Sequence, residues 1–360
     1  MTSSQPDVLV IGAGVSGLTT AVCLAEAGAR VVIQAAVPPA QTTSAAAGAI
    51  WGPHLVGMDG RVARWGAVTL ARLLGLTTEP AAAVRTVTGR QASRAAEDPP
   101  GWATGLDGFR LCTDGELPPG FAAGWRFTAP VITMPRYLDY LQARFRGAGG
   151  HADTRGGHAD ARGRHDDDGR DDGGGRDDGG GRAAPQHDAF GSLDEAAGRT
   201  SARVIVNCAG IGAHGLVPDL ELMPVRGQVV VAANPGVTEF FIGLGDDSAG
   251  LVYLFPHGDT VVLGGTEDRG NWSLEPDPAT AERILRGCAA IEPRLRGARV
   301  VAHRVGLRPV RPAVRLESGR LPGGQTIVHN YGHGGAGVSL SWGCALDAAE
   351  LALAALGAAR

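Results

Sequence analysis

The chain begins its first regular structure with Val8-Leu9-Val10-Ile11-Gly12-Ala13-Gly14-Val15-Ser16-Gly17. Residues 8–11 form a continuous apolar run, which is typical of a parallel strand buried on both faces. The three glycines follow at once and open a helix predicted over residues 15–27, which Gly28 ends. A second strand is predicted over residues 31–33. Strand, glycine pattern and helix together predict a βαβ unit that binds the pyrophosphate of a dinucleotide.

Each glycine of this loop has a separate physical task. Gly12 allows the tight turn, Gly14 lets the backbone approach the pyrophosphate, and Gly17 lets the helix pack closely on the strand. Val15 and Ser16 lie at the helix N-terminus, where free N–H groups and the helix dipole attract phosphate. The alternative is an ordinary turn in a chain that holds 56 glycines. The flanking strand and helix make the binding loop the better interpretation.

The ribose end of the expected site departs from the usual pattern. An acidic residue normally ends the second strand and binds the ribose hydroxyls. Here the segment is Gln34-Ala35-Ala36. Because Gln34 offers only a neutral acceptor, we expect it to bind the ribose more weakly than a carboxylate would. No Arg takes the place that an NADP site would require.

Composition excludes several classes of protein. The 360 residues include 33 basic side chains, all of them Arg, and the formal net charge is -4. This balance gives no support for a nucleic-acid partner or an anionic membrane. Five separated cysteines without a Cys-x-x-Cys pair favour reduced thiols in the cytoplasm and predict no metal site. The N-terminus lacks the features of a signal peptide, and we expect no membrane span.

One segment differs from the rest of the chain. Residues 151–188 are rich in Gly, Asp and Arg and contain no large apolar side chain, so we predict a disordered insertion. Elsewhere, buried strands are predicted at 204–206 and 326–328, and an Ala/Leu-rich helix at 346–356. Strand-like segments at 228–231, 251–255 and 261–263 predict an antiparallel sheet in a second domain.

Several longer motifs resemble those of the D-amino-acid oxidase family. They occur in the family's order and leave only the insertion unmatched. The two most unusual are Gly306-Leu307-Arg308-Pro309-Val310-Arg311-Pro312 and His329-Asn330-Tyr331-Gly332-His333-Gly334-Gly335-Ala336-Gly337. The others are Thr42-Thr43-Ser44, Ala46-Ala47-Gly48-Ala49-Ile50-Trp51-Gly52-Pro53, Met134-Pro135-Arg136-Tyr137-Leu138, Val206-Asn207-Cys208-Ala209-Gly210 and Leu263-Gly264-Gly265.

The resemblance implies an α/β fold. A doubly wound, Rossmann-like FAD-binding domain would be interleaved with an antiparallel α+β substrate domain. The FAD-binding domain would comprise residues 1–75, 137–225 and 304–360, and the substrate domain 76–136 and 226–303. The implied reaction is oxidative deamination of D-amino acids: hydride passes from Cα to flavin N5, water hydrolyses the imino acid to a 2-oxo acid and ammonia, and oxygen becomes hydrogen peroxide. The implied partners are therefore a D-amino acid and oxygen, with a homodimer as a candidate assembly.

The resemblance also assigns roles to individual residues. Arg308 matches the Arg that binds the substrate carboxylate, a role that suits a planar fork of donors. Tyr253 matches a tyrosine that holds the same carboxylate, and Gly335 matches a glycine whose carbonyl accepts from the substrate amine. For Arg308 the alternative is a structural ion pair, and for Tyr253 a core position. The expected cofactor contacts are Gly12, Gly14, Val15, Ser16, Gly17, Gln34, Thr43, Ser44, Ala47, Gly48, Arg308, Gly334, Gly335, Ala336, Gly337, Val338 and Ser339.

We expect no side-chain base in the reaction, because a D-amino acid with a neutral amine can deliver hydride without one. His333 is expected to be structural and to bond the neighbouring backbone. The family's second, lid-side tyrosine would fall near Ala249, where this chain has none, so we expect a more open entrance. Asp246 and Asp247 lie near that entrance, and no Arg occurs between residues 227 and 263. Neutral or basic D-amino acids are therefore expected as substrates before acidic ones.

Three alternative functions are compatible with the same sequence features. A related flavin oxidase acting on D-aspartate, glycine or an imino acid would share these motifs. An NAD(P)-linked dehydrogenase would be colourless instead of yellow. A non-catalytic protein could keep the fold, because the ribose end of the site is altered and the insertion falls where the family has a strand near the adenine.

Overall fold

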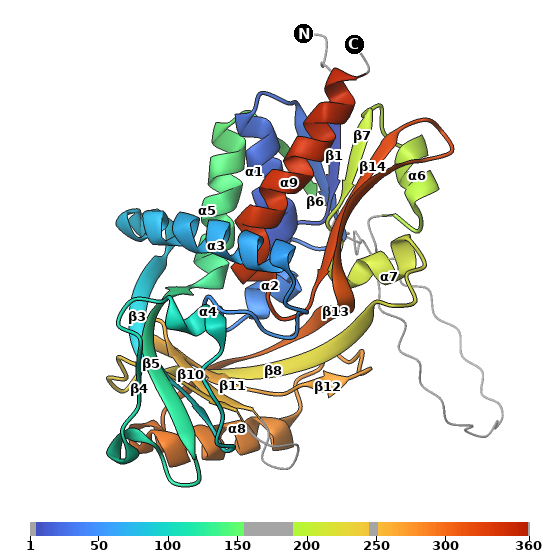
Figure 1. The fold of residues 1–360 in the computed structure, drawn as a ribbon. Coiled ribbons are helices and arrows are strands. Elements are labelled where there is room, and N and C mark those ends of the chain that lie inside the picture. Colours follow the sequence, from blue (N-terminus) through green and yellow to red (C-terminus); the bar gives the residue numbers. More distant parts are fainter. Residues whose placement is uncertain (1–4, 155–189, 245–250, 359–360) are drawn as a thin grey trace, which may run out of the picture.

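The computed structural model describes residues 5–154, 190–244 and 251–358. Its strands form one continuous 14-stranded sheet in the order β4-β5-β3-β9-β10-β11-β8-β13-β14-β7-β1-β2-β6, with β12 paired to β8 beside this path. Figure 1 shows helices grouped around the upper part of the sheet and a second sheet region below, with α8 on its far side.

The first half is a parallel sheet covered by helices. Its strands are β1 (Val8–Ile11), β2 (Val31–Ala35), β6 (His151–Thr154), β7 (Val204–Asn207) and β14 (Thr326–His333). All neighbours in this group pair in parallel. The helices on one face are α1 (Val15–Glu26), α3 (Gly60–Gly75), α5 (Met134–Gly147) and α9 (Gly337–Gly357), and α6 (Leu193–Gly198) lies on the other (Figure 1). The predicted βαβ unit and doubly wound fold are confirmed.

The predicted insertion begins later than residue 151. Residues 151–154 form β6, which continues the parallel sheet beside β2 and pairs Asp153 with Gln34. The prediction was wrong there because backbone hydrogen bonds to β2 can order four residues that bury no large side chain. A strand therefore does occupy this edge of the sheet. The remainder of the predicted insertion, residues 155–188, lies outside the described residues.

The second half is largely antiparallel, as predicted. Its strands are β3 (Val84–Ser93), β4 (Arg110–Leu111), β5 (Ala123–Ile132), β8 (Met223–Ala233), β9 (Phe240–Leu244), β10 (Val252–Pro256), β11 (Thr260–Gly264) and β12 (Asp268–Arg269). Only the β3–β9 pair is parallel within the described part of this half. Helix α8 (Pro278–Ile291) packs Ile284 and Cys288 against the sheet. The short helices α2 (Thr43–Ala46), α4 (Gly101–Thr104) and α7 (Ala213–Leu216) lie in the connections.

One long strand joins the two halves. β13 (Val300–Arg320) pairs with β8 through residues 300–310 and with β14 through residues 310–320. The expected domain boundary near residue 304 falls inside this strand. Arg308 lies close to the point where β13 passes from one half to the other.

The C-terminal helix α9 begins well before the predicted helix over 346–356. By length and composition it could cross a membrane. In this structure, however, it packs against α1 and α3, and many of its side chains, including Trp342 and Cys344, are buried. Its apolar character is explained by its place in the core.

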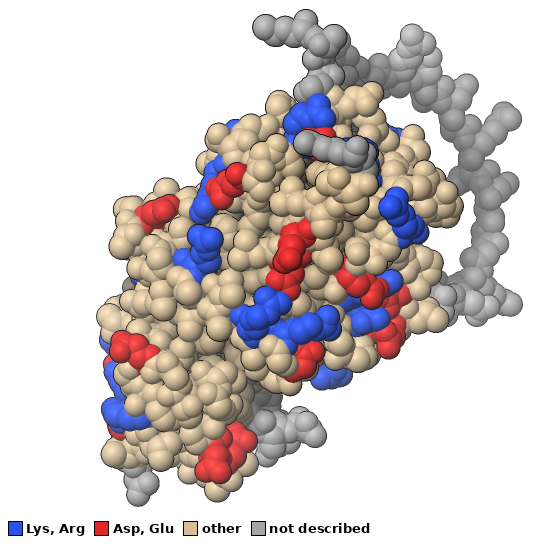
Figure 2. All heavy atoms as spheres, turned by 45° about the horizontal axis from the view of Figure 1, so that its top comes forward, with Lys and Arg blue, Asp and Glu red and all other residues tan. Residues whose placement is uncertain are grey.

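The charged side chains on the face drawn in Figure 2 are mixed in sign, with Arg and acidic residues close to one another. Elsewhere among the described residues, Arg and acidic side chains also form ion pairs, such as Arg64 with Asp347 and Arg311 with Asp219. This face therefore offers no single-sign patch of the kind that nucleic acid requires.

Candidate active site

A cavity of about 1110 Å³ runs from the glycine loop to the antiparallel sheet. It brings together most of the residues selected from the sequence, although they come from distant parts of the chain. The predicted site residues that line it are Gly12, Gly14, Val15, Ser16, Thr43, Ser44, Ala47, Gly48, Tyr253, Arg308, Gly334, Gly335, Gly337, Val338 and Ser339.

Three predicted contacts do not line this cavity: Gly17, Gln34 and Ala336. Gly17 has a packing task, since a Cβ there would lie 2.0 Å from Gly12 O and 3.4 Å from Cys208 Cβ. Ala336 is fully buried beneath the turn. Alternation along β2 and the following bend place Ala35 and Ala36, and not Gln34, in the wall. The ribose contact expected of Gln34 is therefore not supported.

The glycine loop is held in a tight turn against β7 and α2. Gly12 has a φ of 109°, and a Cβ there would lie 2.5 Å from Cys208 O. A Cβ on Gly14 would lie 3.0 Å from Ser44 Oγ. Ser44 Oγ also accepts a hydrogen bond of 2.9 Å from Val15 N–H. Ser44 thus fixes the loop as well as lining the cavity.

Arg308 and Tyr253 stand together at the sheet end of the cavity. The Arg308 guanidinium lies over Gly227, where a Cβ would be 2.5 Å from its Cζ and both terminal nitrogens. Burial raises the pKa of the Tyr253 phenol, and the nearby Arg308 charge opposes that rise only in part. Tyr253 therefore stays a protonated hydroxyl donor next to a permanent cation. Two such donors suit a carboxylate.

The Tyr253 ring is held in place by glycines and by stacking. It stacks on Phe255 with ring centroids 4.7 Å apart. A Cβ on Gly264 would lie 2.2 Å from the ring, and one on Gly265 2.6 Å from it. These contacts explain why the predicted motif Leu263-Gly264-Gly265 needs two residues without side chains.

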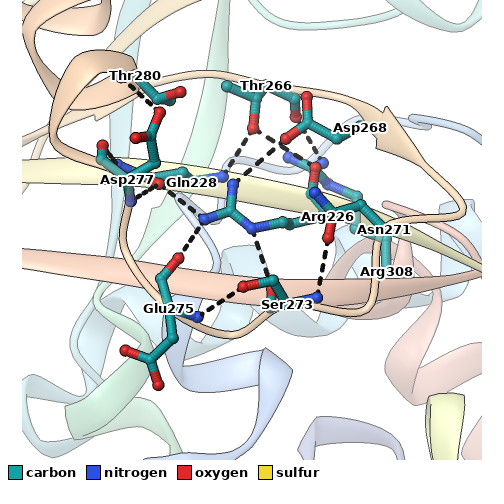
Figure 3. A network of polar contacts seen from close by, with 10 residues as sticks. All are labelled: Arg226, Gln228, Thr266, Asp268, Asn271, Ser273, Glu275, Asp277, Thr280 and Arg308. Atoms are coloured by element: carbon teal, nitrogen blue, oxygen red, sulfur yellow. Dashed lines mark hydrogen bonds and ion pairs between the residues drawn. The ribbon is translucent and has the colours of Figure 1, made fainter. Parts of the chain in front are cut away.

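A buried polar network supports Arg308 from behind (Figure 3). Arg308 Nη1 donates to Thr266 O at 2.8 Å, and Thr266 Oγ1 accepts from Gln228 N–H at 2.9 Å. Arg226 is only 3% exposed and donates to Gln228 Oε1 at 2.9 Å and to Ser273 O at 3.0 Å. The network thereby anchors the segment that carries Trp272 and Leu274, two residues of the cavity wall.

The turn at Gly334-Gly335 faces the segment that precedes α3. Gly334 has a φ of 56° and donates its N–H to Pro309 O at 2.9 Å. Gly335 donates its N–H to His54 O at 3.0 Å. His54 Nε2 lies 3.1 Å from Glu267 Oε1, and this contact lowers the pKa of the Glu267 carboxyl. His54 and Gly335 both line the cavity.

His333 is buried below the turn and bonds a side chain instead of the neighbouring backbone expected for it. Its Nε2 lies 3.0 Å from the side-chain oxygen of Asn330, not from backbone. Burial lowers the pKa of His333 to about 4, so the ring is neutral near pH 7. Asn330 in turn donates to Thr20 Oγ1 at 3.1 Å, which links the turn to α1.

The substrate half contributes an aromatic wall that was not predicted from the sequence: Trp102, Trp125, Phe127 and Phe255 line the cavity, next to Trp51 of the other half. Gln91, Ile242, Glu97 and Asp98 line it as well. Trp125 and Phe127 are two residues apart on β5, so their alternation was the available signal. The predictions about Ala249, Asp246 and Asp247 lie outside the described residues.

Comparison with known proteins agrees with this geometry. A family model described as FAD dependent oxidoreductase matches residues 7–351. A D-amino-acid oxidase of Rubrobacter xylanophilus is 46% identical over 97% of this chain and 96% of its own length. A D-amino-acid oxidase of Streptomyces coelicolor is 39% identical over 96% of each chain, and the human D-aspartate oxidase is 34% identical over 96% and 94%.

Solved structures support the same fold. The glycine oxidase of Geobacillus kaustophilus superimposes with a TM-score of 0.73 at 19% identity, covering 97% of this chain and 95% of that one. At this identity the likeness concerns the fold alone. Since the family model and the relatives span nearly the whole chain, the protein belongs to the D-amino-acid oxidase family of FAD-dependent oxidoreductases.

Proposed function

We propose that this protein catalyses FAD-dependent oxidative deamination of D-amino acids, with neutral or basic substrates preferred over acidic ones. The observation that carries the proposal is the pair Arg308 and Tyr253 in the same cavity as the glycine loop. One end of the cavity suits a pyrophosphate and the other a carboxylate, so a substrate held by Arg308 would face a bound dinucleotide.

The residues present fit FAD. Gly12 and Gly14 leave space where a Cβ would meet the backbone or Ser44, and the α1 N-terminus opens beside them. Gly334, Gly335 and Val338 line the cavity at the start of α9, which suits the polar edge of a flavin. When bound, FAD would accept hydride from the substrate Cα and pass the electrons to oxygen, giving hydrogen peroxide.

The protein's own residues orient the substrate. Arg308 and Tyr253 would hold the carboxylate, and the Gly335 carbonyl would accept a hydrogen bond from the neutral amine. These three contacts fix the direction of the Cα–H bond, which is the main contribution a protein can make to hydride transfer. Since His333 is buried and hydrogen-bonded to Asn330, we assign it no proton transfer.

The charges in the wall support the substrate preference. Among the described residues, Arg308 is the only Arg or Lys that lines the cavity. A substrate carboxylate would already occupy it, leaving no second cation for an acidic side chain. The exposed carboxylates Glu97 and Asp98 also line the wall and would repel such a side chain.

One purified sample tests the proposal. The protein is expected to be yellow, and anaerobic D-alanine should bleach the flavin band while L-alanine does not. Arg308→Leu should keep the flavin and lose most of kcat/KM for D-alanine. Higher kcat/KM for D-aspartate than for D-alanine would contradict the preference, and an unbleached flavin would contradict the activity.

A cytoplasmic location and a homodimeric assembly stay predictions of the sequence. Cell fractionation would test the location, and sedimentation analysis of the purified protein would test the assembly.

A further inference from the structure

Four cavity residues lie in one row across the antiparallel half of the sheet. Tyr253 pairs with Ile242 on β9, Ile242 with Gln91 on β3, and Gln91 with Trp125 on β5. Directly paired residues project from the same face of a sheet. All four residues line the cavity. The row therefore begins at the proposed carboxylate site and continues outward along the wall.

The end of this row that is farthest from Tyr253 carries two buried polar side chains, Trp125 and Gln91. Trp125 is 1% exposed, and its buried Nε1–H has no hydrogen-bond partner among the described residues. A buried donor without an acceptor destabilises the structure that contains it. Its neighbour Gln91 is 7% exposed and brings a carboxamide, which can both donate and accept, to the same wall. Around them the wall is apolar, with Trp102, Phe127 and Ile242.

The spacing suits a substrate side chain. Adjacent strands lie roughly 5 Å apart, so Gln91 is about 10 Å across the sheet from Tyr253. A substrate held by its carboxylate at Tyr253 and Arg308 can direct its side chain over Ile242 toward Gln91. An alanine side chain would end well short of Gln91, whereas one of glutamine length would come within reach of the Gln91 amide.

We propose that Trp125 and Gln91 form a side-chain subsite for D-amino acids that end in a carboxamide, with D-glutamine as the best fit. The substrate amide oxygen would accept from Trp125 Nε1–H, and its NH₂ would donate to the Gln91 side-chain oxygen. A carboxylate of the same length would bring a negative charge toward Glu97 and Asp98, which line the same cavity. This inference rests on the proposed function and specifies its substrate class.

Steady-state kinetics of the flavin-loaded enzyme test the subsite. D-glutamine is compared with D-methionine, which has similar length but no amide, and with D-glutamate and D-alanine. Trp125→Phe keeps an aromatic ring and removes the N–H. It should lower kcat/KM for D-glutamine by roughly 3- to 10-fold while D-methionine and D-alanine change by less than about twofold. Gln91→Leu should lower the D-glutamine value in the same selective way.

Trp65→Phe is the matched control. It also removes an indole N–H, which bonds Asp347 at 2.7 Å, but Trp65 lies outside the cavity. The ratio of D-glutamine to D-methionine kcat/KM should stay at the wild-type value in this variant. A parallel loss for both substrates in Trp125→Phe, an unchanged ratio in both subsite variants, or a wild-type preference for D-glutamate would overturn the subsite.

Failure of the proposed function gives a different result. If wild-type enzyme does not oxidise D-alanine, the activity itself is wrong. The subsite is then tested by titrating D-glutamine and D-methionine into wild-type and Trp125→Phe protein and following the flavin spectrum. Selective weakening of D-glutamine binding in the variant would support the subsite, and equal affinities would overturn it.

Discussion

Arg308 Nη1 donates a hydrogen bond of 2.8 Å to the main-chain oxygen of Thr266. That bond uses Nη1 of the guanidinium, and the proposed function assigns the other N–H groups on its outer edge to the substrate carboxylate. Because Thr266 is itself bonded to Gln228, which is bonded to buried Arg226, the orientation of Arg308 depends on residues that do not line the cavity. Substitutions at Gly227, on which the guanidinium lies, and at Arg226, within the supporting network, should therefore both affect substrate binding.

Gly227→Ala should displace the guanidinium, because a Cβ there would lie 2.5 Å from Arg308 Cζ. We expect kcat/KM for D-alanine to fall on the order of 100-fold, since small errors in substrate position are costly in hydride transfer. Flavin content, measured from the visible spectrum, should not change. Gly198→Ala is the control, because no atom lies within 4 Å of its added Cβ. Unchanged kinetics in Gly227→Ala would show that Arg308 does not rest on this surface.

Arg226→Met should lower the free energy of unfolding by about 2–3 kcal/mol, since it removes a buried donor set and leaves the Gln228 and Ser273 oxygens without it. It should also raise KM for D-alanine, because both Arg308 and the segment with Trp272 lose support. Denaturant unfolding and steady-state kinetics measure these effects. Arg286→Met is the control: its ion pair with Glu282 is largely exposed, so stability should change by less than about 0.5 kcal/mol. Equal stabilities of the two variants would rule out a supporting role.

The sequence located the glycine loop and the carboxylate-binding pair better than the side-chain wall of the cavity. Gly12 and Gly14 could be located because backbone geometry restricts the residue type at those positions, whereas Arg308 was located only by its place in a motif that resembles the family. Gln34 does not line the cavity and Ala35 does, since one residue along a strand reverses the side of the sheet. Motif spacing alone could not decide between Gln34 and its neighbour Ala35.

The aromatic wall and the supporting network were missed for a different reason. Gln91, Trp125 and Ile242 meet only because β3, β5 and β9 pair in one register. That register depends on the whole sheet and is not visible in any single segment. Arg226 has an equally weak local signal, because its partners Asp268, Ser273 and Glu275 are 42 to 49 residues away and two of these three contacts are to main-chain oxygens.

Gly17→Ala should prevent flavin binding, because a Cβ there would lie 2.0 Å from Gly12 O and force the loop apart. The ratio of flavin to protein absorbance in the purified variant should fall to a small fraction of the wild-type value. Gly75→Ala is the control: it ends α3, and no atom lies within 4 Å of the added Cβ. Wild-type flavin content in Gly17→Ala would mean that the loop tolerates a side chain and that its fit to a pyrophosphate has been misjudged.

Acid should destabilise the fold through three histidines that are held neutral. Burial lowers the pKa of His257, His329 and His333 to about 4 in each case. Because the unfolded chain binds these protons near pH 6.5 and the folded chain only near pH 4, the unfolded state holds more protons between these values. Stability is therefore complete above pH 6.5 and falls as the pH drops toward 4, by on the order of 3 kcal/mol per histidine.

Thermal unfolding of the flavin-loaded protein between pH 4 and 7 measures this effect. His257→Gln is the most informative variant, since His257 bonds Gly48 O and Thr133 Oγ1 without lining the cavity. Glutamine can supply a donor but cannot take up a proton in this range, so the melting temperature of the variant should fall less steeply with acid than that of the wild type. His151→Gln, at an exposed position, should leave the slope unchanged. Parallel slopes for wild type and His257→Gln would show that the acid sensitivity arises from other groups, such as the carboxylates paired with Arg.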